Sequence, residues 1–504
     1  MMHRSVIRPA LLVALLTVPA VAGAQNGVAC ENGFAAGFAC DQIDLAARID
    51  LATFETDRGA DLWGWTDPDT GHEYALVGLT NGIAFVDVTT PTSPVYLGKL
   101  PTATIASIWR DVKVYENYAF IVADGAEAHG MQVFDLTTLR GLSADPARRF
   151  TAATNYNGVE GNRPGSSHNV VINEDTGFAY LVGSDDCAGS LHMVDIQNPT
   201  SPTFGGCFSA DGYTHDAQCV TYTGPDPDYT GHEICALSQG TFDSSSHYSF
   251  VDVTDKANPV LISRAFYTDA VYAHQGWFTE DQRYFLGGDE IDDDASATTR
   301  TIIFDVADLD NPEFDFFYLG PVETTDHNLY IRGDYAFLSN YEAGLRVVDI
   351  SGIETETLTE VAYFDTYPES DNESYNGLWT TYPYFESGTL IANDRDYGLF
   401  VLQPTFSITS VEPTLPSEDG YMLSAPQPNP SSGQTRLTLT LAESQYITAE
   451  VLDLTGRRVA LLHEGPARSA LALTLDGSTL SSGLYLVRVV GEAFHATQRV
   501  SIVH

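Results

Sequence analysis

The stretch Leu345-Arg346-Val347-Val348-Asp349-Ile350 decides how the rest of the chain is interpreted. Its apolar run is typical of a buried strand, and the aspartate that ends the run is typical of a turn whose backbone N–H groups donate to the carboxylate. The same pattern recurs at residues 83–88, 131–136, 191–196, 248–253 and 301–306, and residues 398–402 repeat it without the aspartate. The chain therefore repeats one strand-and-turn unit.

The spacing of the copies indicates the fold. The aspartates of the complete copies lie 48, 60, 57, 53 and 44 residues apart, and repeats of about 40–50 residues with several short strands each are typical of propeller blades. The last copy lacks a fourth strand, whereas residues 45–54 form a spare strand before the first copy. Pairing the two would close a ring and remove exposed sheet edges. We expect an all-β protein with a seven-bladed β-propeller in residues 25–405, six or eight blades being the alternatives.

The N-terminus and the cysteines predict export. Arg4 and Arg8 precede an apolar run that is too short to span a membrane, and Ala22-Gly23-Ala24 fits a cleavage site, so residues 1–24 form the expected signal peptide. Six cysteines follow, an even number that is typical of disulfides in an exported chain. Fifteen pairings are possible. Proximity in the sequence favours Cys30–Cys40, Cys187–Cys207 and Cys219–Cys235.

Charge and motifs exclude several classes of function. The formal charge of −44 over 504 residues argues against nucleic acid as a partner, because phosphate recognition needs a basic face. After residue 24 no stretch approaches the ~20 apolar residues of a membrane span, so we expect none in the mature chain. The sequence has no GxSxG, HExxH or P-loop pattern, which disfavours serine hydrolysis, zincin proteolysis and nucleotide chemistry.

The C-terminal part, residues 421–504 after a polar linker at residues 406–420, follows a different pattern. Short strands with period-two alternation predict a small β-sandwich. Pro428-Asn429-Pro430, then Asp453-Leu454-Thr455-Gly456-Arg457, then Ser481-Ser482-Gly483-Leu484-Tyr485 appear in an order that resembles the C-terminal sorting domain of the type IX secretion system. The resemblance implies contact with that secretion machinery and a location at the outer cell surface or outside the cell. An adhesive or carbohydrate-binding sandwich is the alternative.

The repeats carry a second resemblance. Residues 191–196 and 345–350, together with residues 213–219 and 274–282, resemble LVIVD repeats and the choice-of-anchor B family of secreted bacterial proteins. The resemblance covers most of residues 25–405. It implies a secreted repeat protein, and it brings no established activity and no family set of catalytic residues.

One group of residues could carry chemistry. In four successive units the innermost strand begins with a histidine: His168, His215, His274 and His327. Innermost strands line the channel of a propeller, so these imidazoles should converge on one mouth of it. Imidazole suits Zn, Cu, Fe and Ni. The sequence thus indicates one divalent or transition metal at the channel.

Polar residues are expected around these histidines, because the end of the second strand lies beside the start of the first in an antiparallel pair. The expected orienting residues are Asp111, Asp185, Asp216, Asp289, Glu290, Asn328, Asn376 and Asp394. In the alternative interpretation each histidine bonds the backbone of a neighbouring blade and has a structural role only. Three of the units lack the histidine, which weakens that alternative without removing it.

Two functions are compatible with these features. The first is an exported β-propeller that acts as a binding module for an unknown surface ligand, either a protein or a polysaccharide. The alternative is a metal-dependent enzyme of the lyase or oxidase type. In that enzyme the four histidines would be ligands, and Asp185, Asp289 or Glu290 would orient them or act as general base.

Overall fold

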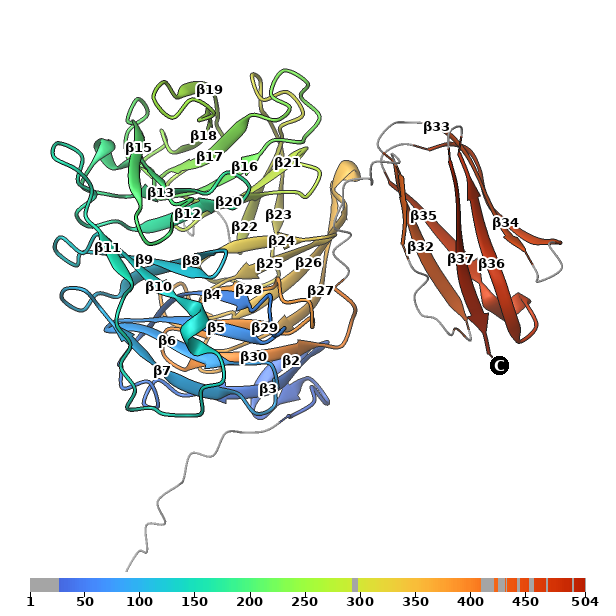
Figure 1. Ribbon diagram of the computed structural model, residues 1–504, viewed down its shortest axis with the longest axis horizontal. Helices are drawn as coiled ribbons and strands as arrows, with labels where there is room; N and C mark the ends of the chain where they lie inside the picture. Colours follow the sequence, from blue (N-terminus) through green and yellow to red (C-terminus); the bar gives the residue numbers. More distant parts are fainter. Residues whose placement is uncertain are drawn as a thin grey trace, which may run out of the picture. The chain divides into compact units, whose positions relative to one another are not determined.

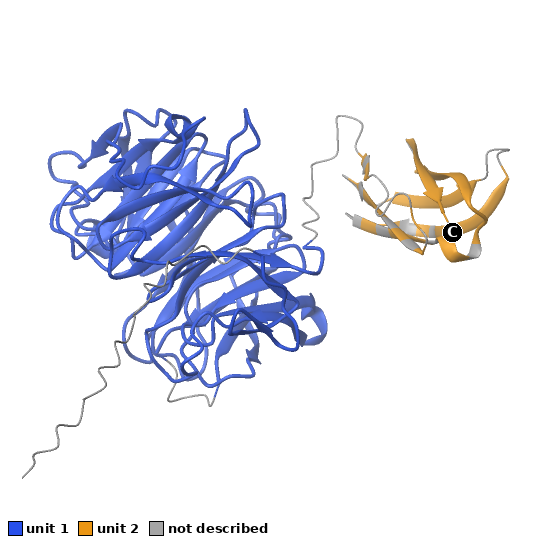
Figure 2. Ribbon diagram, turned by 90° about the horizontal axis from the view of Figure 1, so that it is seen from below, with its two compact units in different colours: residues 1–410 blue, residues 411–504 orange. Residues whose placement is uncertain are grey.

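The structure, a computed structural model, describes residues 27–291, 298–408 and, apart from short gaps at 425–430, 432, 442–444, 453–456, 468–469 and 492–493, residues 421–503. The chain divides into two compact units, residues 1–410 and 411–504 (Figure 2). The expected signal peptide, most of the expected linker and the Pro428-Asn429-Pro430 stretch lie outside the described residues. In the described part, no helix is long and apolar enough to cross a membrane.

The first unit is built from antiparallel sheets of four strands (Figure 1), as the all-β expectation requires. In chain order the first three sheets are β4 (Gly59–Thr66), β5 (Glu73–Leu79), β6 (Gly82–Asp87) and β7 (Val95–Pro101); β8 (Trp109–Tyr115), β9 (Tyr118–Asp124), β10 (Met131–Asp135) and β11 (Thr154–Tyr156); and β12 (Asn169–Asn173), β13 (Phe178–Val182), β14 (Leu191–Asp195) and β15 (Thr203–Phe208).

Four more sheets follow in this unit. They are β16 (Asp216–Thr221), β17 (Glu233–Gln239), β18 (His247–Asp252) and β19 (Val260–Ala265); β20 (Ala273–Phe278), β21 (Tyr284–Asp289), β22 (Arg300–Asp305) and β23 (Glu313–Leu319); β24 (Leu329–Arg332), β25 (Tyr335–Ser339), β26 (Leu345–Gly352) and β27 (Thr357–Phe364); and β28 (Leu378–Tyr382), β29 (Leu390–Asp394), β30 (Gly398–Pro404) and β3 (Ile43–Ile49). One-turn 3-10 segments lie at Leu136–Leu139, Cys187–Gly189 and Ile353–Thr355.

The sheets form a closed, propeller-like ring. The first strands contact one another in the order β4, β8, β12, β16, β20, β24 and β28, and β28 contacts β4 again. The last sheet takes its outer strand from the N-terminus, because β3 pairs antiparallel with β30, for example Leu45 opposite Leu402. This is the closure expected from the sequence, although the strand ends at Ile49 and not at residue 54. This pairing covers the edge that β30 would otherwise expose and closes the ring.

The turns after the third strands depend on their aspartates, as the sequence predicts. In each complete copy the carboxylate accepts a hydrogen bond from the backbone N–H two residues later: Asp87, Asp135, Asp195, Asp252, Asp305 and Asp349. The apolar residues that precede them are buried between neighbouring sheets, for example Phe85 and Val86 at 0% exposure.

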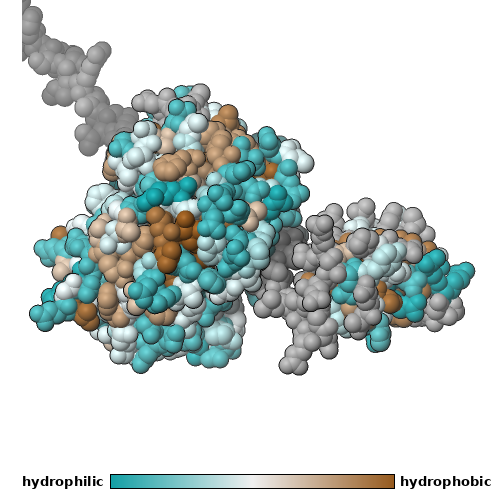
Figure 3. Space-filling view, turned by 90° about the horizontal axis from the view of Figure 1, so that it is seen from above, coloured by the Kyte–Doolittle hydropathy of each residue, from teal (hydrophilic) through white to brown (hydrophobic). Residues whose placement is uncertain are grey.

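On the face seen in Figure 3, hydrophilic side chains surround small groups of hydrophobic ones.

An N-terminal hairpin extends the sixth sheet, and the sequence did not predict it. Strand β1 (Phe34–Ala35) pairs with β2 (Phe38–Asp41), and β2 pairs with β27. The Cys30–Cys40 disulfide closes this hairpin. The structure also contains the Cys187–Cys207 and Cys219–Cys235 disulfides, so all three bridges follow the pairing that proximity favours.

The second unit consists of two sheets that enclose one core. One sheet holds β31 (Tyr421–Leu423), β32 (Gln434–Leu441) and β35 (Ala470–Asp476), and the other holds β34 (Arg458–Ala467), β33 (Gln445–Leu452), β36 (Gly483–Val490) and β37 (His495–Ile502). A 3-10 turn, Gly477–Thr479, follows β35. Buried side chains from both sheets, such as Leu439 and Val487, form the common core. This arrangement is the small β-sandwich expected for the tail.

Candidate functional site

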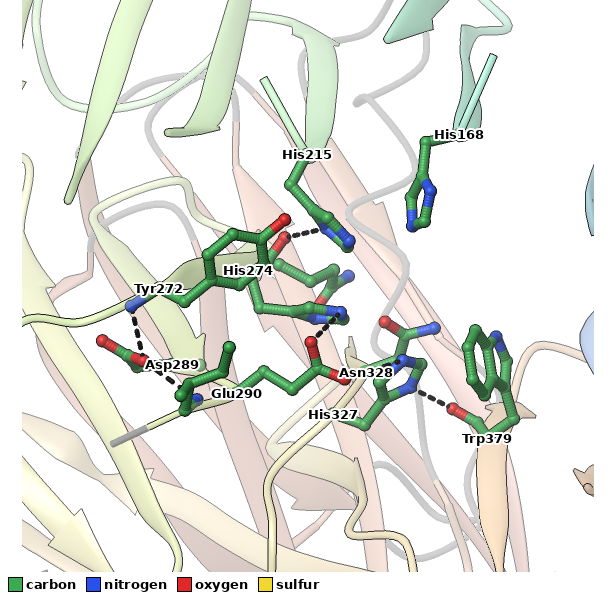
Figure 4. Close-up of polar contacts among 12 residues, drawn as sticks. His168, His215, Tyr272, His274, Asp289, Glu290, His327, Asn328 and Trp379 are labelled. Carbon is green, nitrogen blue, oxygen red and sulfur yellow. Dashed lines mark hydrogen bonds and ion pairs between the residues drawn. The ribbon is translucent and has the colours of Figure 1, made fainter. Parts of the chain in front are cut away.

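The four predicted histidines lie side by side where the innermost strands begin (Figure 4). His168 and His215 directly precede β12 and β16. His274 is the second residue of β20, and His327 lies two residues before β24. Successive ring centroids in this order are 4.4, 4.1 and 4.5 Å apart. The structure therefore brings the four rings into one row, which we call the His cluster.

Three of these rings are oriented through their Nδ1 atoms. The Nδ1 atom of His168 lies 3.0 Å from a carboxylate oxygen of Asp124. His215 Nδ1 donates to the carbonyl of His274 at 2.9 Å, and His327 Nδ1 donates to the carbonyl of Trp379 at 2.5 Å. Since a carbonyl can only accept, the proton of His215 and of His327 is on Nδ1 and Nε2 keeps its lone pair. Proteins commonly prepare imidazole for metal coordination in this way.

Glu290 joins the cluster from the end of the second strand of the fifth sheet. Its carboxylate lies 3.6 Å from Nε2 of His274 and 4.0 Å from Nε2 of His327. The hydroxyl of Tyr341 donates to the same carboxylate at 2.6 Å. One ligand atom from each of His274, Glu290 and His327 lies within 4.8 Å of the others. Such a set of two imidazoles and a carboxylate can hold a metal ion.

Burial keeps three of these imidazoles neutral, those of His215, His274 and His327. Desolvation lowers the pKa of His215 and His274 well below the usual value, and neighbouring histidines lower it further. Burial also lowers the pKa of His327, to about 3. The Nδ1 atom of His274 is buried and has no hydrogen-bond partner among the described residues. The neutral form is the one that coordinates metals, so the electrostatics of the cluster favour a ligand set.

The other residues expected to orient the histidines have different hydrogen bonds. Among the described contacts, Glu290 alone of the eight reaches a histidine side chain. The remaining seven act as follows: Asp111, Asp185, Asp216, Asp289 and Asp394 accept from the backbone N–H of Val170, Ser166, Ala217, Tyr272 and Asp396, while Asn328 donates to Asp61 and Asn376 to Glu342. In these contacts they satisfy polar groups of strands and turns.

Around the His cluster, the positions of some residues differ from those expected when the repeating units are aligned by sequence. The backbone bulges between Leu378 and Thr380, and this bulge places Trp379, not Asn376, beside the His cluster. The rings of His327 and Trp379 are 4.4 Å apart. Asp124, at the end of the second strand β9, holds His168.

A second polar layer lies one residue further along the innermost strands. The ammonium of Lys113 lies 2.6 Å from Asp111, and the carboxylates of Asp61 and Asp216 are near enough to raise its pKa together with Asp111, against the effect of burial. Burial raises the pKa of Asp61 to about 7 and that of Asp216 to about 8. We call this group the axial cluster. It places three carboxylates around one lysine.

The axial cluster makes stability depend on pH. Asp61 holds its proton in the folded state up to about pH 7, whereas an unfolded aspartate releases it near pH 4, so ionising Asp61 destabilises the fold as pH rises between these values. The variant Asp61→Asn cannot ionise. We expect the difference in free energy of unfolding, variant minus wild type, to be about 2 kcal/mol more favourable at pH 8 than at pH 5. Denaturant titrations at both pH values measure this, and a constant difference would contradict it.

Family models match both units of the chain. Residues 427–503 match a secretion system C-terminal sorting domain. Residues 108–127, 164–209 and 327–353 match the LVIVD repeat, so two of the four histidines, His168 and His327, lie in matched repeats. No curated protein sequence matches the chain.

Among solved structures the chain is similar to a protein from Lactobacillus plantarum, with 14% identity, a TM-score of 0.42, and coverage of 83% of this chain and 99% of that one. It is also similar to a functionally unknown protein from Desulfotomaculum acetoxidans (11% identity, TM-score 0.42, 63% and 87% coverage). A periplasmic gluconolactonase of Pseudomonas aeruginosa is similar at 11% identity, with a TM-score of 0.41 and 60% and 87% coverage.

The two family matches confirm the repeats and the sorting tail that the sequence predicted, while membership of the choice-of-anchor B family stays a prediction. A C-terminal sorting domain of this type indicates transport by the type IX secretion system. The chain contains LVIVD repeats and a C-terminal sorting domain, and that domain directs it to the cell surface or the surrounding medium.

Proposed function

We propose that the protein is an exported binding module, and that a transition metal ion held by the His cluster is the point at which its ligand docks. One observation carries the proposal: ligand atoms of His274, His327 and Glu290 lie within 4.8 Å of one another on three separate strand ends. The ring of His327 is oriented for coordination through Nε2, because its Nδ1 donates to the carbonyl of Trp379. The neighbouring His215 is oriented in the same way by the carbonyl of His274.

The ligand types narrow the choice of ion. Neutral imidazoles suit Zn, Cu, Fe and Ni, and a single carboxylate does not supply the oxygen-rich shell that Ca²⁺ requires. Three protein ligands leave at least one position open on a tetrahedral ion, and an oxygen atom of an extracellular ligand would take it. His215, whose ring centroid is 4.1 Å from that of His274, borders the proposed ion.

We propose binding and not catalysis because Asp289 and Glu290, two of the three expected general bases, are otherwise engaged. Asp289 accepts hydrogen bonds from the hydroxyl of Tyr267 and from the N–H groups of Val271 and Tyr272. Glu290 accepts from Tyr341 and faces the histidines. A base that takes a proton from a substrate needs a free oxygen near the reacting atom.

The test is the metal content of the full chain, purified without an affinity histidine tag. We expect one equivalent of Zn, Cu, Fe or Ni by plasma mass spectrometry, either as purified or after reloading. Metal that binds only the folded protein also raises its melting temperature, by mass action. A protein that stays metal-free after incubation with Zn²⁺, Cu²⁺, Fe²⁺ and Ni²⁺, with an unchanged melting temperature, would overturn the proposal.

A further inference from the structure

Exposed aromatic side chains surround the His cluster. Trp109, Tyr213, Phe242 and Tyr375 are 41%, 37%, 67% and 49% exposed, and we call these four the aromatic rim. Large aromatic side chains are normally buried, and several of them gathered on one face mark a binding surface. Their exposure here is therefore a feature to explain.

Ring-to-ring contacts connect the rim to the cluster. The ring of Trp109 lies 6.4 Å from that of His168. Phe242 packs against Tyr272 at 4.3 Å, and Tyr272 lies 5.3 Å from His215. On the other side, Tyr375 meets Tyr341 at 5.5 Å, and Tyr341 lies 4.7 Å from His327, completing a path of aromatic rings through the cluster. Packed aromatic rings thus link the exposed Trp109, Phe242 and Tyr375 to the buried histidines.

The members of the rim come from three sheets of the ring, and Tyr213 and Phe242 share one of them. Trp109 begins β8, and Tyr213 lies just before β16. Phe242 follows β17, and Tyr375 precedes β28. These positions distribute the aromatic faces around the mouth with the polar cluster between them. A ligand that spans the mouth would meet hydrogen-bonding and metal-coordinating groups at its centre and flat apolar faces at its edges.

The charge of this face selects against acidic ligands. Asp124 contacts His168 at the mouth, and Asp243 follows Phe242 directly. Of the two arginines near β28, Arg58 is paired with Asp396, and Arg395 lies over the ring of Trp379 with a hydrogen bond to the carbonyl of Tyr375. The chain as a whole carries a formal charge of −44. A polyanion would be repelled by this charge at a range of about 10 Å in 0.1 M salt.

We propose that the aromatic rim binds a neutral polysaccharide, whose sugar hydroxyls reach the metal of the His cluster and whose apolar ring faces stack on the rim. This inference rests on the proposed function for the central ion. A sugar ring has an apolar C–H face and a rim of hydroxyl groups, which matches the alternation of aromatic faces and polar groups at the mouth. Tyrosine and tryptophan suit such ligands because they offer rigid contact area at a low entropic cost.

The experiment measures retardation of the full chain, loaded with Zn²⁺, in native gels that contain one polysaccharide each. The neutral probes are a β-glucan, a mannan, a galactan and soluble chitin fragments, and the acidic probes are polygalacturonate and a sulfated glycan. We expect retardation by at least one neutral probe and by neither acidic probe. The variants Trp109→Ala and Phe242→Ala should each weaken that binding about tenfold, as truncation of a central aromatic contact does.

Phe34→Ala is the matched control, because Phe34 is 58% exposed but belongs to the N-terminal hairpin β1 and not to the rim. It should bind the neutral probe as wild type does. Trp109→Ala and Phe242→Ala should keep the wild-type Zn²⁺ content and melting temperature, which separates loss of the rim from loss of the fold. Trp109→Phe, which keeps an aromatic face, should recover most of the binding.

The outcomes distinguish the inference from the proposed function. Zn²⁺ binding with no retardation by any neutral probe, or with retardation by the acidic probes alone, overturns the polysaccharide inference and leaves the metal site intact. Retardation that the rim variants do not weaken overturns it as well, and so does capture of a protein partner that the rim variants abolish without any glycan binding. Failure to bind any metal overturns the proposed function, whatever the gels show.

Discussion

Replacing His274 and His327 together with alanine is expected to weaken Zn²⁺ binding by at least about 100-fold, because even the loss of a residue that only orients a ligand typically costs 10–100-fold. At an ion concentration 100 times the dissociation constant, metal binding stabilises a folded protein by about 2.7 kcal/mol. The double variant should therefore also lose the rise in melting temperature that Zn²⁺ gives to wild type. Calorimetric titration and thermal melts with and without Zn²⁺ measure both effects.

Two further variants keep this prediction decisive if the double variant folds poorly. Glu290→Gln preserves the side-chain volume and still accepts the hydrogen bond of Tyr341, but it removes the negative charge that faces the two histidines. We expect it to fold normally and to bind Zn²⁺ about 10–100-fold more weakly. His232→Ala is the matched control, because His232 is half exposed, contacts Asp252, and lies at the end of the β16–β17 pair away from His215. Equal Zn²⁺ affinity in all these proteins would contradict the assignment.

Replacing Lys113 with methionine is expected to destabilise the protein by about 3–5 kcal/mol at pH 8, the usual cost of removing one partner from a buried ion pair. Lys113 is 2.6 Å from Asp111, and the carboxylates of Asp61 and Asp216 also act on it. Without the ammonium the three carboxylates, of which Asp61 and Asp111 are buried, would repel one another. The loss should be smaller at pH 5, because Asp61 and Asp216, with pKa values raised to about 7 and about 8, are protonated there. Urea unfolding at both pH values measures the difference.

Lys256→Met is the matched control for this second prediction. Lys256 is buried to a similar extent and pairs with a single carboxylate, Glu233, at 2.6 Å. That carboxylate also accepts hydrogen bonds from Tyr180 and Thr176, so it keeps partners when the lysine is lost. We expect a smaller loss for Lys256→Met than for Lys113→Met at pH 8. Equal losses in the two variants would show that the three carboxylates of the axial cluster do not act together.

Much of the fold could be predicted because it depends on local and repeated features. An aspartate that accepts from the N–H two residues later needs only a short stretch of chain, and the structure has this bond in all six complete copies. The period of the copies predicted the sheets, and the spare strand before the first copy predicted the pairing of β3 with β30. The β1–β2 hairpin was not predicted, because its two short strands depend on contact with β27, more than 300 residues away.

The candidate site was likewise predictable only where it depends on the repeating unit. The sequence by itself determined that His168, His215, His274 and His327 would meet, because they occupy one position of a repeating unit and the ring brings such positions together. Only the tertiary structure decided which polar groups accompany them. Glu290 reaches two histidines, a bulge puts Trp379 beside the cluster, and Lys113 lies among three carboxylates. These contacts join residues of different sheets, and they depend on strand bulges and side-chain directions that no single unit encodes.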